Sequence, residues 1–306
     1  MPGDTLIITQ VGDSLQLSDS LFHRQLASVP GHAVVNDNTR FFLVVLVFVL
    51  VIATPFFINW IRRRWLRNSR YRNARAHFEQ YNEWLAEYNA YYKSLPPVMR
   101  QRFLERVAWF MAAKTFNCIN PIAEEKMPLL ISAASIQITF GLEKYQLDFF
   151  DTIYIMQQNY NYGRYEQPFE GHVNSNGIYL SWDNFVKGYE DYTDADNLGI
   201  HEMAHALAYV NFMLGTNDGQ DPDFIKRFYA FSAVARPLFA AMQNGGTKLL
   251  NAYAATNYNE FWAVAVETFF EKPLHMKVEM PALYEAMCSL LNQDPLLPEK
   301  LREYIL

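Results

Sequence analysis

Two histidines and a glutamate at a spacing suited to metal chemistry lie in an apolar stretch of the chain, at His201, Glu202 and His205. On an α-helix, residues i and i+4 share one face, so the two imidazoles can bind one metal ion. The glutamate can reach a water on that ion and serve as its general base. The alternative is a helix with two incidental histidines, but this helix is apolar nearly all round, and buried imidazoles need a partner. The spacing therefore predicts a hydrolytic site with one Zn²⁺ per chain.

The third metal ligand must come from elsewhere in the chain. One class of zinc site places a glycine and a third histidine after the pair, and Ala208 and Asn211 at those positions exclude that class. The other solution is a carboxylate from a later helix, which leaves a fourth position open for water. Glu260 opens an apolar segment with Asn259 as its expected cap, and Glu267 falls on nearly the same stripe of that helix. From spacing alone, either glutamate could be the ligand, and the other would hydrogen-bond to a histidine N–H.

The motif around the two histidines (residues 199–205) and the segment 253–270 together resemble the Mlc titration factor A family of zinc metallopeptidases. The active site of that family is similar to that of the anthrax lethal factor peptidase. The resemblance implies a peptidase of the gluzincin type, in which Glu260 is the third zinc ligand. It also implies that the phenol of Tyr253 points at the site and stabilises the oxyanion that develops during hydrolysis.

The resemblance also covers residues 177–182 and, more loosely, the chain from about residue 100 to residue 294. The sequence departs from the family at two points. An aspartate often stands in family members where this chain has Ala208. Family members are also typically soluble, whereas this chain carries a long apolar segment.

Helices and a small sheet are expected to position these residues. Strands are indicated at residues 149–156 and 176–182, where turn-forming residues bound the segments. Helical spacing indicates further helices over residues 71–94, 100–116 and 124–134. Helices that flank a small mixed sheet make an α+β, zincin-like fold, in which a strand beside the metal can bind an extended substrate by backbone pairing. The predicted substrate strand comprises Gly177, Ile178, Tyr179, Leu180 and Ser181.

A transmembrane helix is predicted over residues 41–61, which carry no charged side chain and are long enough to span a bilayer core of roughly 30 Å. The sequence before this helix has two arginines, Arg24 and Arg40. Seven arginines follow it: Arg62, Arg63, Arg64, Arg67, Arg70, Arg72 and Arg75. Under the positive-inside rule, the C-terminal side lies in the cytoplasm, and the chain crosses the inner or cytoplasmic membrane once. Beside a membrane, such arginines are expected to contact anionic head groups rather than nucleic acid.

Four regions follow from these patterns. Residues 1–40 are predicted to be a poorly structured extracytoplasmic tail, 41–61 the transmembrane helix, 62–95 a basic juxtamembrane segment with a spacer helix, and 96–306 the zinc metallopeptidase domain. The formal net charge is -6 although the segment after the span is basic, so the remainder is acidic and does not attract nucleic acid. The two cysteines have no metal-binding spacing, which suits a reducing cytoplasm.

The sequence thus predicts a membrane-anchored, zinc-dependent peptidase that hydrolyses peptides or proteins with a metal-activated water. The alternative is a membrane-tethered protein that binds or sequesters a cytoplasmic regulator and has a zinc-stabilised fold, because the similar family is named for binding a transcriptional repressor. Glu202 favours catalysis, since binding alone does not need a general base.

Overall fold

The computed structural model describes most of the chain, namely residues 37–119, 124–163, 167–212, 221–245 and 249–298. The chain forms two compact units, Met1–Arg63 and Arg64–Leu306. The predicted extracytoplasmic tail, residues 1–40, lies almost entirely outside the described residues.

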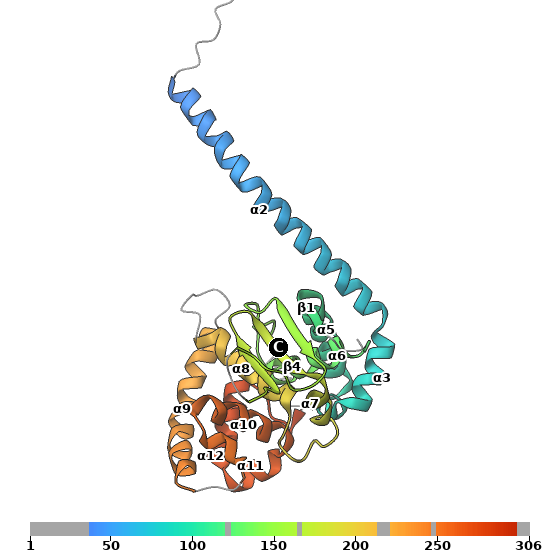
Figure 1. Cartoon of the computed structure of the whole chain (residues 1–306), viewed down its shortest axis with the longest axis vertical. Coiled ribbons are helices and arrows are strands. Elements are labelled where there is room, and N and C mark those ends of the chain that lie inside the picture. Colours follow the sequence, from blue (N-terminus) through green and yellow to red (C-terminus); the bar gives the residue numbers. More distant parts are fainter. Residues whose placement is uncertain (1–36, 120–123, 164–166, 213–220, 246–248, 299–306) are drawn as a thin grey trace, which may run out of the picture. The chain divides into compact units, whose positions relative to one another are not determined.

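Helix α2 (Asp37–Ala76) contains the apolar run that was predicted to cross a membrane (Figure 1). Its apolar side chains are exposed, and Phe41 and Ile61, at the two ends of the run, have exposed fractions of 66% and 46%. Pro55 lies inside the helix. Within the described part of the chain, α2 is the one helix that is long and apolar enough to span a bilayer. A buried core helix would have covered these side chains, so that alternative does not fit.

The segment predicted as one spacer helix, residues 71–94, is divided among the end of α2, α3 (Phe78–Tyr88) and α4 (Ala90–Ser94). Asn89 has an extended backbone between α3 and α4, and its side chain accepts a hydrogen bond from the Tyr92 N–H at 2.7 Å. This contact caps a new helix instead of continuing the old one. Tyr92 is fully buried, so these short helices contribute to the core of the second unit.

The next two helices form at boundaries that differ from the prediction. Helix α5 (Pro97–Ala113) begins with a proline in its first turn. It ends before residue 116 because the chain enters strand β1 (Thr115–Ile119). Helix α6 (Met127–Thr139) begins and ends later than predicted and is buried along nearly its whole length, which makes it the central core helix.

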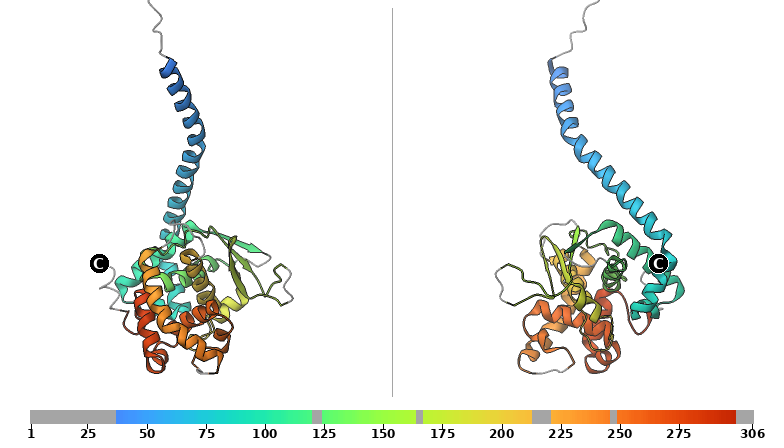
Figure 2. Two further views of the ribbon diagram at one scale, coloured as in Figure 1. Left: turned by 90° about the vertical axis from the view of Figure 1, so that its left-hand side faces the viewer. Right: turned by 45° about the vertical axis from the view of Figure 1, so that its right-hand side comes forward.

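Four strands form one mixed sheet in the order β1-β2-β4-β3. Strands β2 (Thr152–Met156) and β4 (Gly177–Ser181) continue the parallel part, and β3 (Gly171–Asn174) is antiparallel to β4 at the edge. Ile153 and Leu180, on the inner face, are fully buried. Figure 2 shows the sheet at one side of the second unit with the helices gathered on the other side. The predicted α+β class is therefore confirmed.

Strand β4 has a hydrogen-bonded neighbour on each side, so neither of its edges is free. Ile178 pairs with Ile153 of β2 on one side and with Val173 of β3 on the other. The prediction that Gly177–Ser181 binds an extended substrate is therefore wrong, because its backbone groups are already used within the sheet. Of the two edge strands, β3 is the one that lies against α8, since Gly171 contacts Glu202.

The remaining described elements are helical and follow the sheet in the chain. They are α7 (Trp182–Lys187), α8 (Leu198–Phe212), α9 (Pro222–Gln243), the 3-10 helix η1 (Ala252–Ala255), α10 (Tyr258–Glu271), α11 (Pro273–Glu279) and α12 (Pro281–Leu291). Helices α8 and α10 are both apolar on most sides and pack against each other in the core. The indole N–H of Trp262 on α10 donates to the carbonyl oxygen of Ala204 on α8 at 2.9 Å. This pairing brings the two histidines opposite the glutamates of α10.

Candidate metal centre

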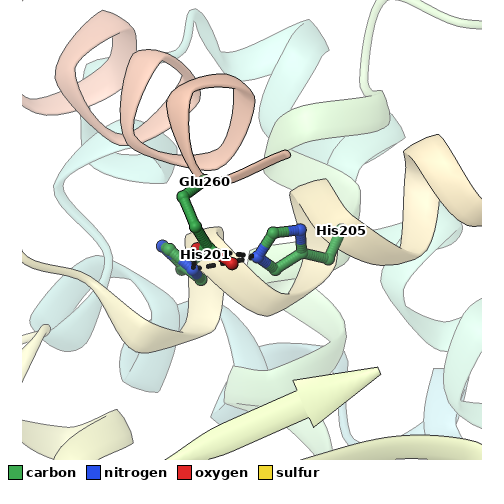
Figure 3. Close-up of side chains that lie close together, drawn as sticks. All are labelled: His201, His205 and Glu260. Atoms are coloured by element: carbon green, nitrogen blue, oxygen red, sulfur yellow. Dashed lines mark hydrogen bonds and ion pairs between the residues drawn. The ribbon is translucent and has the colours of Figure 1, made fainter. Parts of the chain in front are cut away.

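His201 and His205 lie one turn apart on α8, and Glu260 reaches them from α10 (Figure 3). The Nε2 atom of His201 lies 3.0 Å from the Nε2 atom of His205 and 3.0 Å from Oε2 of Glu260. The Nε2 atom of His205 lies 3.3 Å from the same carboxylate oxygen. These three possible ligand atoms all lie within 4.8 Å of one another. The structure thus brings the two predicted histidines together with one of the two competing glutamates.

The start of α10 fixes the position of Glu260. Its cap is Asn257, not Asn259 as predicted, because only Asn257 has the extended backbone that precedes the helix. The side-chain oxygen of Asn257 accepts hydrogen bonds from the N–H groups of Asn259 at 2.9 Å and Glu260 at 3.1 Å. Glu260 is therefore the third residue of α10, where the helix dipole also favours a negative charge.

Glu267 contacts the opposite side of the His201 ring. Its Oε1 atom accepts a hydrogen bond from Nδ1 of His201. The residue lies two turns after Glu260 on α10, and its exposed fraction is 4%. The two glutamates that spacing left equivalent are thus distinguished, because Glu260 faces both Nε2 atoms and Glu267 faces only Nδ1. A carboxylate behind a histidine in this way orients the ring of a metal ligand.

The donor set fits a metal cation. If a metal ion replaces the Nε2 proton of His201, the ring still donates from Nδ1 to Glu267, and its Nε2 lone pair faces His205 and Glu260. Burial lowers the pKa of His201, but hydrogen bonds to Glu260 and Glu267 outweigh it and raise the pKa to about 10. Burial opposes ionisation of Glu260, yet hydrogen bonds to both histidines lower its pKa to about 2. The site therefore stabilises positive charge, and two imidazoles with a carboxylate form a ligand set of divalent transition metals.

Glu202 is buried beneath strand β3, with an exposed fraction of 4%. A Cβ atom on Gly171 would lie 2.6 Å from Oε1 of Glu202, so any other residue there would force the carboxylate or the strand to move. Its Oε2 atom has no hydrogen-bond partner among the described residues. Burial raises the pKa of Glu202 to about 8, His201 opposes the rise, and the charges of Glu260 and Glu267 add to it. The raised pKa makes the ionised form of Glu202 a strong proton acceptor, and Oε2 is the oxygen available for the proton.

Tyr253 lies on the 3-10 helix η1, beside the metal ligands. The Asn251 side chain accepts a hydrogen bond from its backbone N–H at 3.0 Å, and its ring centroid lies 6.1 Å from that of His201. The side chain is 52% exposed. Burial of the hydroxyl and the negative charges of Glu260 and Glu202 raise the pKa of Tyr253. The phenol therefore keeps its proton at neutral pH and can donate it in a hydrogen bond.

Two cavities meet at the site and share His201, Glu202, Gly171 and Tyr253 in their walls. The polar cavity has a volume of about 760 Å³ and is lined by Gln167, Glu170, Asp196, Asn197 and Asn251. The aromatic cavity has a volume of about 710 Å³ and is lined by Tyr209, Phe212, Phe228, Tyr258 and Trp262. A chain that passes the metal ligands can therefore place side chains in two chemically different surroundings.

Asn197 belongs to the site but did not emerge from the sequence. Its side-chain oxygen accepts a hydrogen bond from the Ile200 N–H at 3.0 Å and so caps α8. Its side-chain amide donates to Oε1 of Glu271 at 2.9 Å, and its backbone N–H donates to Oε2 of Glu267 at 3.3 Å. Asn197 thus joins the start of α8 to α10. An asparagine just before an apolar helix is a known start signal, but it does not reveal the partners on a distant helix.

Comparison with known proteins places this chain in a known family. The family of the glucose-regulated metallo-peptidase M90 matches residues 60–291. An uncharacterized protein of Synechocystis sp. is 23% identical over 224 residues, which are 68% of this chain and 81% of that protein. Mlc titration factor A of Cronobacter sakazakii is 34% identical over 135 residues, 41% of this chain and 48% of that protein. Mlc titration factor A of Yersinia pestis is 30% identical over 128 residues, 39% of this chain and 45% of that protein.

The chain thus spans about half the length of the Mlc titration factor A proteins that it matches. The resemblance that the motifs predicted is confirmed, and the family match includes both α8 and α10, which carry the candidate ligands. The chain belongs to the glucose-regulated metallo-peptidase M90 family.

Proposed function

We propose that the protein is a membrane-anchored zinc peptidase, which hydrolyses peptide bonds in peptides or proteins with a metal-activated water. The observation that carries this proposal is the convergence of His201, His205 and Glu260 next to the buried Glu202. Membership in a metallopeptidase family supports a metal-dependent reaction. Two histidines and one glutamate, with a fourth position left for water, support zinc as the metal, with one ion per chain.

Each residue of the site has a distinct task in this proposal. His201, His205 and Glu260 hold the ion, and Glu267 fixes the His201 ring through Nδ1. When bound, zinc supplies Lewis acidity, which lowers the pKa of a water toward 7 and polarises the scissile carbonyl. Glu202 accepts the proton of the attacking water and delivers it to the leaving amine. Tyr253 donates a hydrogen bond to the developing oxyanion.

An extended substrate is proposed to bind along the edge of β3 at Gly171 and Val173; just before β3, the backbone of Phe169 already pairs with that of Tyr160. In an antiparallel pair, the backbone groups of alternate residues face the partner strand and the open edge. The Ser181 N–H donates to the Glu170 carbonyl oxygen at 2.7 Å, so Glu170 faces β4, whereas Gly171 and Val173 present their backbone groups to the open edge. Because Gly171 also lies over Glu202, a substrate paired there has a peptide bond close to the proposed base and the metal ligands.

Helix α2 is proposed to anchor the enzyme in the inner or cytoplasmic membrane in a single pass. Its length and apolar composition support this role. The seven arginines at positions 62–75 support an orientation with the peptidase unit in the cytoplasm and residues 1–40 outside. All seven are exposed and can contact anionic lipid head groups. Proteins in the cytoplasm, or cytoplasmic loops of membrane proteins, are then the substrates within reach.

A second function is supported by the name of two relatives, Mlc titration factor A. It is the binding of a cytoplasmic regulator by a membrane-tethered protein whose metal is structural. Glu202 favours catalysis over this alternative, because a buried carboxylate with an unused oxygen is costly and binding gives it no task.

The test uses the full chain in detergent, a diverse peptide library and measurement of bound zinc. We expect about one zinc per chain and hydrolysis that stops when a chelator is added. Glu202→Gln should keep its zinc and lose roughly 10²- to 10⁴-fold in kcat, because it removes only the base. His205→Ala should lose most of the zinc as well.

Glu279→Gln is the matched control, since Glu279 is an exposed glutamate at the end of α11, and it should behave as wild type. Near-normal turnover of Glu202→Gln would contradict the proposed base. Full zinc occupancy in His205→Ala would contradict the proposed ligands. The second function would be favoured if wild type hydrolyses no peptide and if wild type and Glu202→Gln bind a regulator equally well.

A further inference from the structure

We infer that the aromatic cavity binds a large apolar side chain from the residue just before the scissile bond, and that Ala208 sets the depth of this pocket. The inference rests on the proposed peptidase function and adds a substrate preference to it. It follows from the direction of β3, the packing of the cavity walls and the face of α8 that carries His201, His205 and Ala208.

Strand β3 fixes the direction in which a substrate passes the site. Residues 167–171 line the polar cavity, Phe169 and Gly171 line both cavities, and His172 and Val173 line only the aromatic one, so the strand runs from the first cavity toward the second. A substrate strand pairs more stably in the antiparallel sense, which is also how β3 pairs with β4. Its chain then runs from the aromatic cavity to the polar cavity. Residues before the scissile bond therefore lie in the aromatic cavity, and residues after it lie in the polar one.

The walls of the aromatic cavity are held in place before any substrate binds. The ring of Phe228 lies 4.4 Å from that of Phe212 and 5.7 Å, edge-on, from that of Trp262. Trp262 is fixed by its hydrogen bond to the Ala204 carbonyl oxygen, and Tyr258 by a 3.0 Å hydrogen bond to Ser232. Arg236 also lines the cavity, and its guanidinium carbon lies 5.1 Å from the centroid of the Tyr258 ring. A preformed, mainly aromatic wall binds an apolar side chain without ordering its own side chains first.

Ala208 is the small residue among the large ones of this cavity. It lies on α8, three residues after His205 and seven after His201, so it continues the face that carries the metal ligands. The next residue on this face is Phe212. The single methyl group of Ala208 leaves the space between the metal ligands and the aromatic wall open. A longer side chain at this position would take up space in the pocket.

The test compares Ala208→Leu with wild type, using full chains in detergent and peptides that differ only in the residue before a defined scissile bond. Wild type should cleave after Phe, Tyr, Leu or Met in preference to Ala. Ala208→Leu should lose about 10- to 200-fold in kcat/KM for the Phe peptide, the range expected when one hydrophobic group no longer fits. The Ala peptide should be cleaved as before, and bound zinc should be unchanged. Ala240→Leu, at an exposed alanine of α9, is the matched control and should show no change.

A binding measurement separates this inference from the proposed function. In the Glu202→Gln background, a fluorescent peptide with Phe before the scissile bond should bind at least 10-fold more weakly when Ala208→Leu is added. Large apolar residues found after the cut, or an equal loss for Phe and Ala peptides with full zinc, would overturn the inference while leaving the peptidase function intact. If wild type hydrolyses none of the peptides in a chelator-sensitive way, the proposed function is overturned instead. If, in addition, Ala208→Leu leaves binding of the Phe peptide unchanged, the inference is overturned too.

Discussion

His201 contacts two glutamates of α10, one through each ring nitrogen. The two glutamates are seven residues apart, so α10 must present both on one face at a fixed separation. Burial of Glu267 at an exposed fraction of 4% and the hydrogen bond from the Asn197 backbone leave it little freedom to move. The same residue type on the same helix thus serves two roles, which depend only on the nitrogen that each glutamate faces.

Substituting each glutamate by glutamine should separate these roles. Glu260→Gln removes a charged ligand, so we expect zinc affinity to fall further than for any other change on α10. Glu267→Gln keeps a hydrogen-bond acceptor for Nδ1 of His201 and should lower zinc affinity by only about 10- to 100-fold. Competition with a chelator of known affinity measures both effects. A larger loss for Glu267→Gln than for Glu260→Gln would mean that the ligand and its supporting residue are interchanged.

Gly171 is expected to be essential for the position of Glu202. The Cβ atom in Gly171→Ala would lie 2.6 Å from Oε1 of Glu202, which forces the carboxylate or the strand to move. Because a displaced base loses its contribution to catalysis, we expect kcat to fall by roughly 10²-fold or more with zinc still bound. Val173→Ala, a smaller side chain on the same strand, should cost far less. Steady-state kinetics and zinc analysis of both variants provide the check, and equal kcat values for them would contradict a steric role for Gly171.

At the scale of elements, the helical half of the site could be predicted because its signals are local. The four-residue spacing of His201 and His205 and the shared stripe of Glu260 and Glu267 follow from helical periodicity within one segment. The choice between the two glutamates needed a family resemblance, because it depends on how two separate helices pack. Sequence periodicity does not contain that information.

The strand half of the site could not be predicted in the same way. Strand β4 was expected to be the strand beside the metal that binds substrate, but it lies inside the sheet, and β3 is the edge strand whose Gly171 lies over Glu202. Strand order depends on pairing between segments, and a four-residue strand with a glycine gives only a weak local signal. The same holds for Asn257, because the start of α10 is set by the preceding turn and helix ends are the least certain part of a prediction.

Glu271, at the end of α10, should make the stability of the fold depend on pH. The exposed fraction of Glu271 is 8%, and burial raises its pKa to about 8 from the usual 4.5. The hydrogen bond from Asn197 opposes this rise, and the charges of Glu267 and Asp194 add to it. Because the folded state binds this proton more tightly, the contribution of Glu271 to stability is complete below pH 4.5. It is lost as the pH rises through about 8.

Glu271→Gln removes this titration and should reduce the loss of stability between pH 6 and pH 9. Since one pKa unit corresponds to roughly 1.4 kcal/mol, we expect the variant to gain at least about 1 kcal/mol relative to wild type over that interval. Urea unfolding at several pH values measures the difference. Glu285→Gln, at an exposed position of α12, is the matched control and should follow wild type. Parallel pH profiles for Glu271→Gln and wild type would show that Glu271 is already ionised in the folded state.

At the scale of the whole molecule, the chain joins a basic segment, which follows an apolar helix, to an acidic remainder. The formal net charge of -6 includes the seven arginines at positions 62–75, so the remaining charges are more acidic than the total indicates. An acidic surface is repelled by anionic lipids, whereas exposed arginines are attracted to them. This separation of charge is consistent with the proposed membrane anchor, because the basic segment directly follows the apolar helix.

The proposed orientation in the membrane determines which proteins the proposed peptidase can reach. Because the arginines follow the apolar helix, we expect the peptidase unit to lie in the cytoplasm. A reporter that works only in the cytoplasm should be active when fused after Leu306, and a reporter that works only outside the cytoplasm should be inactive at the same position. Replacing the seven arginines with asparagine should weaken this preference, whereas replacing Arg100 and Arg102, far from the apolar helix in sequence, should not. The reverse pattern of reporter activity would place the substrates outside the cytoplasm. The predictions on zinc binding and kinetics would still hold, because they depend only on residues of the second unit.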